Sequence, residues 1–428
     1  MMCALVLLTL LVCTVFTYGR PYHNSHDKLS ILGSSTVLEP RCGVTAPKVV
    51  IISLFSPEAA IWYENANSEG SIGNLMERNI SVPGLSPLFP NLHCLKDGSV
   101  CQVTTGESEI NAAASITALV QSPLFDFRKT YFLVAGIAGI NPKHGTLCDV
   151  AFSKYAIQVA LQYEIDMRDL PNNYSSGYIP LGATVPDEYP RNIYGTEVFE
   201  LNERLRDVAV EFASKAILKD SPNAEAYRAK YASNVEYSAA LRKPSVIRCD
   251  VTTSDVYFSG ARLGEVFENT TRLFTNGSGV YCMTAQEDNA ILEVMVRAAM
   301  RKIVDYSRII IMRTASDFDR PYPGQATTEN LFYMPPGAFE TAIFNIYAAG
   351  TPVIQGILSG WQLVFENGIA ATNYIGDIFG SLGGRPDFGP GSISSQASQT
   401  TMRRVAAPMI TARSQAYRKK VLSDEEQA

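Results

Sequence analysis

The stretch from residue 308 to residue 321, RIIIMRTASDFDRP, joins a run of apolar residues to side chains that can bind anions and transfer protons. The apolar residues 309–312 are typical of a strand buried on both faces. Because ligands of open α/β sheets collect outside the carboxyl ends of the strands, we expect Arg313, Ser316, Asp317 and Asp319 to project into a crevice. Taken alone, the stretch is equally compatible with a strand that ends in a solvated acidic turn.

Other expected strands are also followed by polar or glycine-rich segments. Strands are expected at 47–54, 101–105, 130–139, 148–160 and within 246–258. Helices are expected at 58–67, 110–121 (with Ser108 as N-cap), 197–218, 283–306 and 338–368. Polar or glycine-containing segments follow at 53–58, 106–109 and 136–139, and the polar cluster 286–289 opens the longest helix. This alternation predicts an α/β fold with a mixed central sheet flanked by helices on both faces.

Length and composition indicate an ordinary globular protein. The chain has 428 residues, of which 46% are hydrophobic and 18% charged, and its net charge of −6 does not suggest a nucleic-acid partner. We expect an N-terminal arm at 20–46, one α/β domain at 47–391 with an insertion at about 163–245, and a disordered basic tail at 392–428. After the N-terminal leader no apolar stretch approaches the roughly 20 residues of a spanning helix, which argues against a polytopic membrane domain.

The N-terminus predicts entry into the secretory pathway. Residues 1–19 form an apolar run that ends in small residues, as in a signal peptide, although the missing Lys or Arg at its start leaves a signal anchor open. Four Asn-x-Ser/Thr sequons, which would be glycosylated in a secreted protein, lie at Asn79, Asn173, Asn269 and Asn276. We therefore expect a glycoprotein that is secreted or at the cell surface.

The six cysteines outside the leader are an even set, which suits an oxidising compartment. Cys94 and Cys101 flank the turn signal at 96–99 and are the first expected disulfide, with Cys249–Cys282 the second. Cys42 and Cys148 are as compatible with buried free thiols as with a third bond. The four His have no metal-ligand spacing, so no metal site is predicted.

Over almost its entire mature length the chain resembles the fungal purine nucleoside permease family. The segments that carry the resemblance are 103–114 (VTTGESEINAAA), 130–144, 281–289 (YCMTAQEDN) and 373–380 (NYIGDIFG). At the level of fold it is similar to the nucleoside phosphorylase superfamily, including methylthioadenosine/S-adenosylhomocysteine nucleosidase. The resemblance implies a three-layer nucleoside-phosphorylase-like architecture and a purine nucleoside as ligand, and it implies a homodimer or larger assembly.

The superfamily's general acid is an Asp in an Arg-x-x-Ser-Asp motif, and residues 313–317 match this motif. By resemblance Asp317 would donate a proton or hydrogen bond to N7 of the leaving purine, so its pKa should be raised by burial and by neighbours such as Asp319. The ribose is normally held by a Met-Glu pair. Gln286 and Glu287 occupy that position here, and Glu287 would accept hydrogen bonds from the ribose hydroxyls.

The resemblance also assigns a base pocket. Ser254 and Asp255 are followed by Tyr257, expected to stack on the purine, and by Phe258, whose backbone would read the edge of the base. A close-approach floor is expected from Gly136, Ala138 and Gly139. The remaining residues assigned to substrate binding are Phe55, Met283, Arg313 and Ser316.

The loop after the first strand bears on the reaction. Phosphorylases bring cations to phosphate, yet no Lys or Arg occurs between Lys48 and Arg78. Glu58 stands there instead and, by resemblance to the nucleosidases, would activate water, which favours hydrolysis over phosphorolysis. Arg128 and Lys129 leave phosphorolysis open, with inorganic phosphate as co-substrate; otherwise no cofactor is expected.

Two alternatives accompany this interpretation. Glu58 and Glu287 are each expected near the start of a helix, where a carboxylate is favoured by the helix dipole without any catalytic role. The competing class of function is a permease or nucleoside uptake component without catalysis, which needs the pocket aromatics but has no use for Asp317 and Glu58.

Overall fold

The computed structural model describes residues 43–388. The predicted signal peptide, the free or bonded state of Cys42, nearly all of the predicted N-terminal arm and the predicted tail lie outside the described residues.

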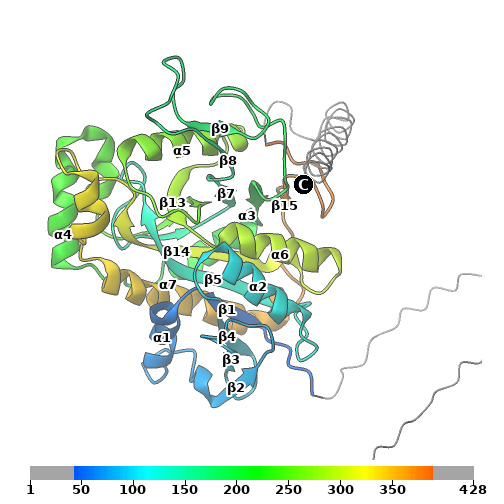
Figure 1. The fold of residues 1–428 in the computed structure, drawn as a ribbon. Helices are drawn as coiled ribbons and strands as arrows, with labels where there is room; N and C mark the ends of the chain where they lie inside the picture. Colours follow the sequence, from blue (N-terminus) through cyan, green and yellow to red (C-terminus); the bar gives the residue numbers. More distant parts are fainter. Residues whose placement is uncertain (1–42, 389–428) are drawn as a thin grey trace, which may run out of the picture. The chain divides into compact units, whose positions relative to one another are not determined.

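The core of the described chain is a mixed 13-stranded sheet (Figure 1). Its strands are β1 (Val49–Ser53), β2 (Arg78–Ser81), β3 (Asn91–Cys94), β4 (Val100–Thr104), β5 (Tyr131–Ile140), β6 (Val150–Phe152), β7 (Tyr155–Gln158), β10 (Val198–Glu200), β11 (Val246–Arg248), β12 (Asp250–Thr253), β13 (Tyr281–Ala285), β14 (Ile309–Phe318) and β15 (Gly376–Asp377). The central strand β5 is parallel to β1 and β14 and antiparallel to β13. A separate two-stranded sheet joins β8 (Gln162–Glu164) to β9 (Tyr178–Pro180).

Seven α-helices accompany the sheet within residues 43–388: α1 (Ser56–Glu64), α2 (Ser108–Gln121), α3 (Glu203–Ala213), α4 (Pro222–Arg228), α5 (Ala261–Phe274), α6 (Asp288–Met300) and α7 (Phe339–Ser359). Side chains of a strand point alternately to its two faces. In β1, Val50 and Ile52 therefore belong to the core that α2 and α6 cover, whereas Val49 and Ile51 belong to the core that α1, α3 and α7 cover. Figure 1 shows α2 and α6 next to each other in front of the sheet, as their mutual contacts require. The predicted mixed sheet with helices on both faces is confirmed.

Three predicted elements have different bounds. The strand expected at 148–160 is two strands, β6 and β7, which pair with different neighbours. The helix expected from residue 197 is preceded by β10, and the helix expected from residue 283 is preceded by β13. In both cases a genuine helical pattern was extended backwards over a short buried strand, because a few apolar residues suit either structure.

The segment 163–245 contributes to the main body. Its strand β10 pairs with β7 and β15, and its helix α3 packs against α7. Within residues 43–388 one helix, α7, is long and apolar enough to cross a membrane by length and composition, so the expectation that no apolar stretch approaches this length was wrong. The helix contacts β14, α1 and α3, and 61% of its most apolar window is buried inside the protein, as in a core helix.

Both predicted disulfides are present. Cys94–Cys101 joins the paired strands β3 and β4, and Cys249–Cys282 links the start of β12 to its neighbour β13. Cys148 is a buried free thiol, and burial raises its pKa to about 12. Such a thiol is unreactive at neutral pH, which makes it a packing residue.

Candidate functional site: a cavity at the carboxyl ends of the central strands

A cavity of about 510 Å³ opens where β1, β5, β13 and β14 end. This volume is typical of sites for small organic ligands. Its wall comes from Leu54, Phe55, Glu58, Glu107, Ile137, Ala138, Gly139, Ser254, Val256, Tyr257, Phe258, Ser259, Thr284, Ala285, Gln286, Glu287, Arg313, Ser316, Asp317, Phe318, Asn330, Leu331, Phe332, Pro335, Pro336 and Phe339. Segments far apart in the sequence thus meet at the edge of the sheet where the sequence predicts a ligand.

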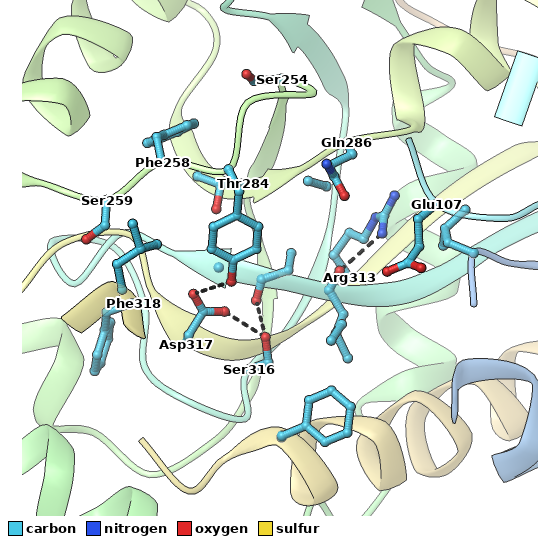
Figure 2. Close-up of a pocket in the computed structure, with 18 of the residues that line it drawn as sticks. Glu107, Ser254, Phe258, Ser259, Thr284, Gln286, Arg313, Ser316, Asp317 and Phe318 are labelled. Carbon is cyan, nitrogen blue, oxygen red and sulfur yellow. Dashed lines mark hydrogen bonds between the residues drawn. The ribbon is translucent and has the colours of Figure 1, made fainter. Parts of the chain in front are cut away.

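Asp317 lies in this cavity near the end of β14, which continues beyond the predicted strand. Between Ala315 and Asp317 the register to β5 shifts by one residue, so that Ser316 is the extra residue of a β-bulge. Bulges commonly re-aim a side chain next to a site. The Oγ of Ser316 donates to Oδ1 of Asp317 at 2.7 Å, and the hydroxyl of Tyr257 donates to Oδ2 at 3.3 Å (Figure 2).

The pKa of Asp317 is raised, chiefly because the carboxyl is removed from bulk water. The two hydroxyl donors lower this pKa, and the nearby carboxylate of Asp319 raises it slightly further. Burial and Asp319 are the causes expected from the sequence. A carboxylic acid that keeps its proton to higher pH is suited to act as a proton donor.

The aromatic residues expected around the base are at the mouth of the cavity. Tyr257 is 67% exposed, so one face of its ring is free for a ligand. Phe258 lines the cavity too, but its ring packs edge-on against Phe267 at 4.7 Å between centroids. Phe55 also lines the cavity, where it packs against Phe339 at 6.3 Å between ring centroids. The cavity thus has apolar aromatic walls near Asp317.

A buried charge cluster forms the opposite side. The guanidinium of Arg313 binds Asp288 at 2.7 Å and Glu287 at 3.0 Å, and it donates to the carbonyl of Ile137 at 3.1 Å. Burial lowers the pKa of Arg313, but the carboxylates of Asp288, Glu287 and Glu58 outweigh it, so that the pKa is raised. Both hydrogen-bonding sides of this cation are therefore committed to protein groups.

Glu287 is fixed by two hydrogen-bond donors. Its Oε2 accepts from Arg313, and its Oε1 accepts from the backbone N–H of Ser108 at 3.0 Å. Burial raises the pKa of Glu287 although Arg313 acts in the opposite direction. Gln286, beside it, donates to the carbonyl of Asp255 at 3.3 Å and so ties the end of β13 to the base-pocket loop.

Glu58 is buried on the same side of the cavity as Arg313. Its Oε2 accepts from the N–H of Leu54 at 2.6 Å and its Oε1 from the N–H of Ile137 at 2.7 Å, and the residue is only 1% exposed. Burial raises the pKa of Glu58 to about 8, although Arg313 and the two amides lower it. At neutral pH most molecules therefore carry the protonated form.

Gly136 and Gly139 have different structural roles. A Cβ at Gly136 would come within 2.6 Å of Oε1 of Glu58 and 2.7 Å of Nη1 of Arg313, so this glycine makes room for the charge cluster. A Cβ at Gly139 would meet Oγ1 of Thr284 at 2.5 Å and approach Asp317. Gly139 and Ala138 line the cavity, whereas Gly136 lies behind its wall.

Other residues predicted for the site do not line the cavity. Met283 is fully buried in the core between β12 and β5, because it lies in β13 rather than in a helix that opens onto the site. Asp319, expected in the crevice, is 2% exposed and pairs with Arg320 at 2.9 Å. The two candidate phosphate ligands are engaged outside the cavity wall: Arg128 with Asp126 at 2.5 Å and Lys129 with Glu366 at 2.8 Å.

Sequence reasoning missed several contributors to the site. Asp288, the closest ion-pair partner of Arg313, was noted only as part of a polar cluster. Thr284 and the loop 330–336 carry no motif, and nothing in the chain links them to the site before it folds. Glu107 was passed over because its neighbours were expected to form a turn and a cap; in the structure it is itself the N-cap of α2 and lines the cavity.

Comparison with known proteins agrees with this picture. The family model described as purine nucleoside permease matches residues 46–370. A purine nucleoside permease of Candida albicans is 48% identical over 354 residues, covering 82% of this chain and 84% of the relative. A probable purine nucleoside permease of Schizosaccharomyces pombe is 37% identical over 347 residues, covering 78% and 97%. The chain belongs to the purine nucleoside permease family.

Solved structures that resemble the chain include nucleosidases. The 5′-methylthioadenosine/S-adenosylhomocysteine nucleosidase of Neisseria meningitidis aligns with 73% of this chain and 100% of its own, at 14% identity and a TM-score of 0.41. The enzyme of the same name from Helicobacter pylori aligns with 74% and 99%, at 11% identity and a TM-score of 0.43. Futalosine hydrolase of Helicobacter pylori aligns with 71% and 97%, at 12% identity and a TM-score of 0.42.

Proposed function

We propose that this protein binds a purine nucleoside in the cavity and hydrolyses its N-glycosidic bond. The observation that carries the proposal is the carboxyl of Asp317, whose pKa is raised and which faces the cavity beneath the exposed ring of Tyr257. A carboxyl with a raised pKa, at the point where an aromatic wall can position a base, is suited to protonate the purine as it leaves, which cleavage requires.

The proposed chemistry uses residues on both sides of the cavity. The purine stacks on Tyr257, and Asp317 protonates N7 as the bond between C1′ and N9 breaks. Glu287 accepts hydrogen bonds from the ribose hydroxyls and stabilises the positive charge that develops on the sugar. Water then attacks C1′ from the far face, where a carboxylate takes its proton; the sequence names Glu58 for that role.

One strand passes both carboxyl groups. Ile137 of β5 contacts Glu58, and Gly139, two residues further along the same strand, lies beside Asp317. A strand rises by about 3.3 Å per residue, so the two groups meet β5 at positions about 6.6 Å apart along the backbone. Two carboxyl groups near one cavity are the equipment that hydrolysis of a glycosidic bond by a bound water requires.

The charges of the cavity support hydrolysis rather than phosphorolysis. Of the cavity-lining residues within 43–388, Arg313 is the one cation, and it is already bound by Glu287 and Asp288. The same wall carries the acidic side chains of Glu58, Glu107, Glu287 and Asp317. A phosphate dianion would find no free cation to bind it in this site.

The second candidate function is nucleoside uptake without catalysis. The names of the relatives favour it, because the matched proteins of both yeasts are called permeases. Under either function we propose that the protein acts outside the cell or at its surface; the apolar N-terminus and the two disulfides support this location.

One incubation separates the three outcomes. Purified full-length protein is mixed with inosine or adenosine, with and without inorganic phosphate, and the products are separated by chromatography. Free ribose and purine in both conditions support hydrolysis. Ribose 1-phosphate that forms only with phosphate would replace hydrolysis by phosphorolysis. Intact nucleoside, recovered from a protein that calorimetry shows to bind it, would leave binding or transport.

A further inference from the structure

The carboxylates of the cavity differ in what already binds them. Glu58 accepts two backbone N–H groups, and Glu287 accepts a backbone N–H and Arg313. Asp317 accepts two hydroxyls. Glu107 is exposed and lines the cavity. Within residues 43–388 its backbone carbonyl accepts a hydrogen bond from the side chain of Asn111, and its own side chain makes no hydrogen bond to the protein. Its carboxylate is thus the one with both oxygens available to a ligand or water among these lining residues.

The backbone around Glu107 is unusual. Gly106 has a φ of +85° and Ser108 a φ of +75°, so left-handed residues stand on both sides of Glu107. Ser108 has a side chain and rarely adopts this conformation. Strain of this kind persists where the surroundings enforce it, and it gathers at functional sites. Here it turns the N–H of Ser108 towards Glu287, which brings Glu107 next to the carboxylate proposed to hold the ribose.

Helix capping does not explain a glutamate at this position. N-cap positions favour Ser, Thr, Asp and Asn, whose short side chains reach the first free N–H groups of the helix. Glu107 is the N-cap of α2 and its side chain makes no capping hydrogen bond. Figure 2 instead shows its carboxylate on the Arg313 side of the cavity, across from Asp317.

We infer that Glu107, and not Glu58, is the catalytic base that activates water in the proposed reaction. This inference rests on the proposed hydrolysis. Glu107 takes a proton from water while the water oxygen forms a bond to C1′. The bond from C1′ to N9 breaks, its electron pair stays on the purine, and N7 takes the proton of Asp317. Ribose and purine leave, and both carboxyl groups regain their starting states by proton exchange with solvent.

Glu58 is then a positioning residue. The hydrogen bonds that it accepts from the N–H groups of Leu54 and Ile137 join the end of β1 to β5, and its side chain lies beside the guanidinium of Arg313 next to Gly136. With a pKa of about 8 it carries a proton in most molecules at neutral pH, which suits a structural link better than proton acceptance. The carboxylate of Glu107 also repels phosphate. The same residue therefore favours water over phosphate as the group that attacks C1′.

The test compares nucleoside hydrolysis by the full-length wild type and the variants Glu107→Gln, Glu107→Ala and Glu58→Ala. General base catalysis contributes about 10²- to 10⁴-fold, so kcat of both Glu107 variants should fall by about that factor with KM little changed. Added formate should restore at least part of kcat in Glu107→Ala, where it fits the vacated space, and not in Glu107→Gln. A residue with a merely structural role would not respond to formate.

Glu109→Gln is the matched control, because Glu109 lies two residues further on and lines a different cavity; its kcat should stay within about threefold of the wild type, well short of a lost general base. Wild-type kcat in Glu107→Ala, or rescue by formate of a Glu58→Ala variant instead, would overturn the assignment while leaving hydrolysis intact. A wild type that cleaves no nucleoside would overturn the proposed function as well.

Discussion

The two sides of the cavity differ in the type of side chain and in its exposure to solvent. On the side of Arg313, ionisable groups are buried: Arg313, Glu58 and Asp288 are each exposed by 1% or less, and each is bound by other protein groups. On the side of Asp317 the wall is aromatic and open, with Tyr257 67% and Phe332 67% exposed. The first side therefore depends on its own pairing, and the second is free to meet a ligand.

Because of this difference, we expect substitutions on the buried side to change stability and substitutions on the exposed side to change the reaction. A change in the sealed side should unfold or loosen the protein, because a buried charge that loses its partner is costly. A change in the open side should leave the fold intact and alter what happens to the ligand. The proposed reaction needs both: a rigid array that holds the sugar, and an accessible acid beneath the base.

The largest effect is expected from Asp317→Asn. Asparagine keeps the shape of the side chain but has no acidic proton to donate, so kcat for nucleoside hydrolysis should fall by about 10²- to 10⁴-fold. Nucleoside affinity, measured by calorimetry, should change little. Thermal unfolding at an unchanged temperature is the control that the loss lies in the chemistry. Turnover equal to that of the wild type would remove Asp317 from the reaction.

Arg313→Met should produce the largest loss of stability. It leaves Glu287 and Asp288 buried without their cation, and breaking a buried pair in this way costs about 3–5 kcal/mol. Urea unfolding measures the change. Arg297→Met is the matched control, because Arg297 is 74% exposed and pairs with Glu293 on the surface of α6. Such exposed pairs contribute about 0–1 kcal/mol. Equal losses in the two variants would contradict the contrast between the sides.

Gly136→Ala tests the space behind the charge cluster. The added methyl would meet Glu58, Leu54 and Arg313 at 2.6–2.7 Å, and overpacking of this kind costs about 1–3 kcal/mol. Because the methyl pushes on Glu58, the accompanying variant Glu58→Ala should recover part of the loss. Absence of such a recovery in the double variant would mean that the strain is taken up elsewhere in β5.

The smallest effect concerns pH. Tyr257 donates to Asp317 and thereby lowers its pKa, so Tyr257→Phe should raise the pKa of Asp317 further while the ring can still stack. The reaction needs the protonated acid, and activity is lost as pH rises through this pKa. The alkaline limb of the profile of kcat/KM should therefore move to higher pH. A limb that moves to lower pH would contradict the role of Asp317 as the acid.

The sequence predicted those parts of the site that depend on local pattern. The run 309–312 identified β14, and Arg313, Ser316 and Asp317 after it line a cavity, together with Glu58, Glu287, Tyr257 and Phe258. The Cys94–Cys101 disulfide followed from the turn signal between its cysteines. These features are set by short stretches of chain whose composition admits few structures.

What the sequence could not give is decided by tertiary contacts. The β-bulge at Ser316 depends on how β14 lies against β5, and no residue type announces it. Met283 was assigned to the site because a helical pattern overran β13. Glu107 has no motif; its importance comes from two left-handed neighbours and from where α2 begins, which only the folded backbone reveals.

The most direct test of the account is the anomer of the ribose that leaves the site. The proposed reaction places the acid on the purine side of the sugar and the base on the other side, which requires water to attack from the face opposite the purine. Proton NMR during turnover of a β-nucleoside should therefore show α-ribose first, before the anomers equilibrate in solution. Release of β-ribose first, or a nucleoside that stays intact while bound, would contradict the arrangement on which the proposed reaction depends.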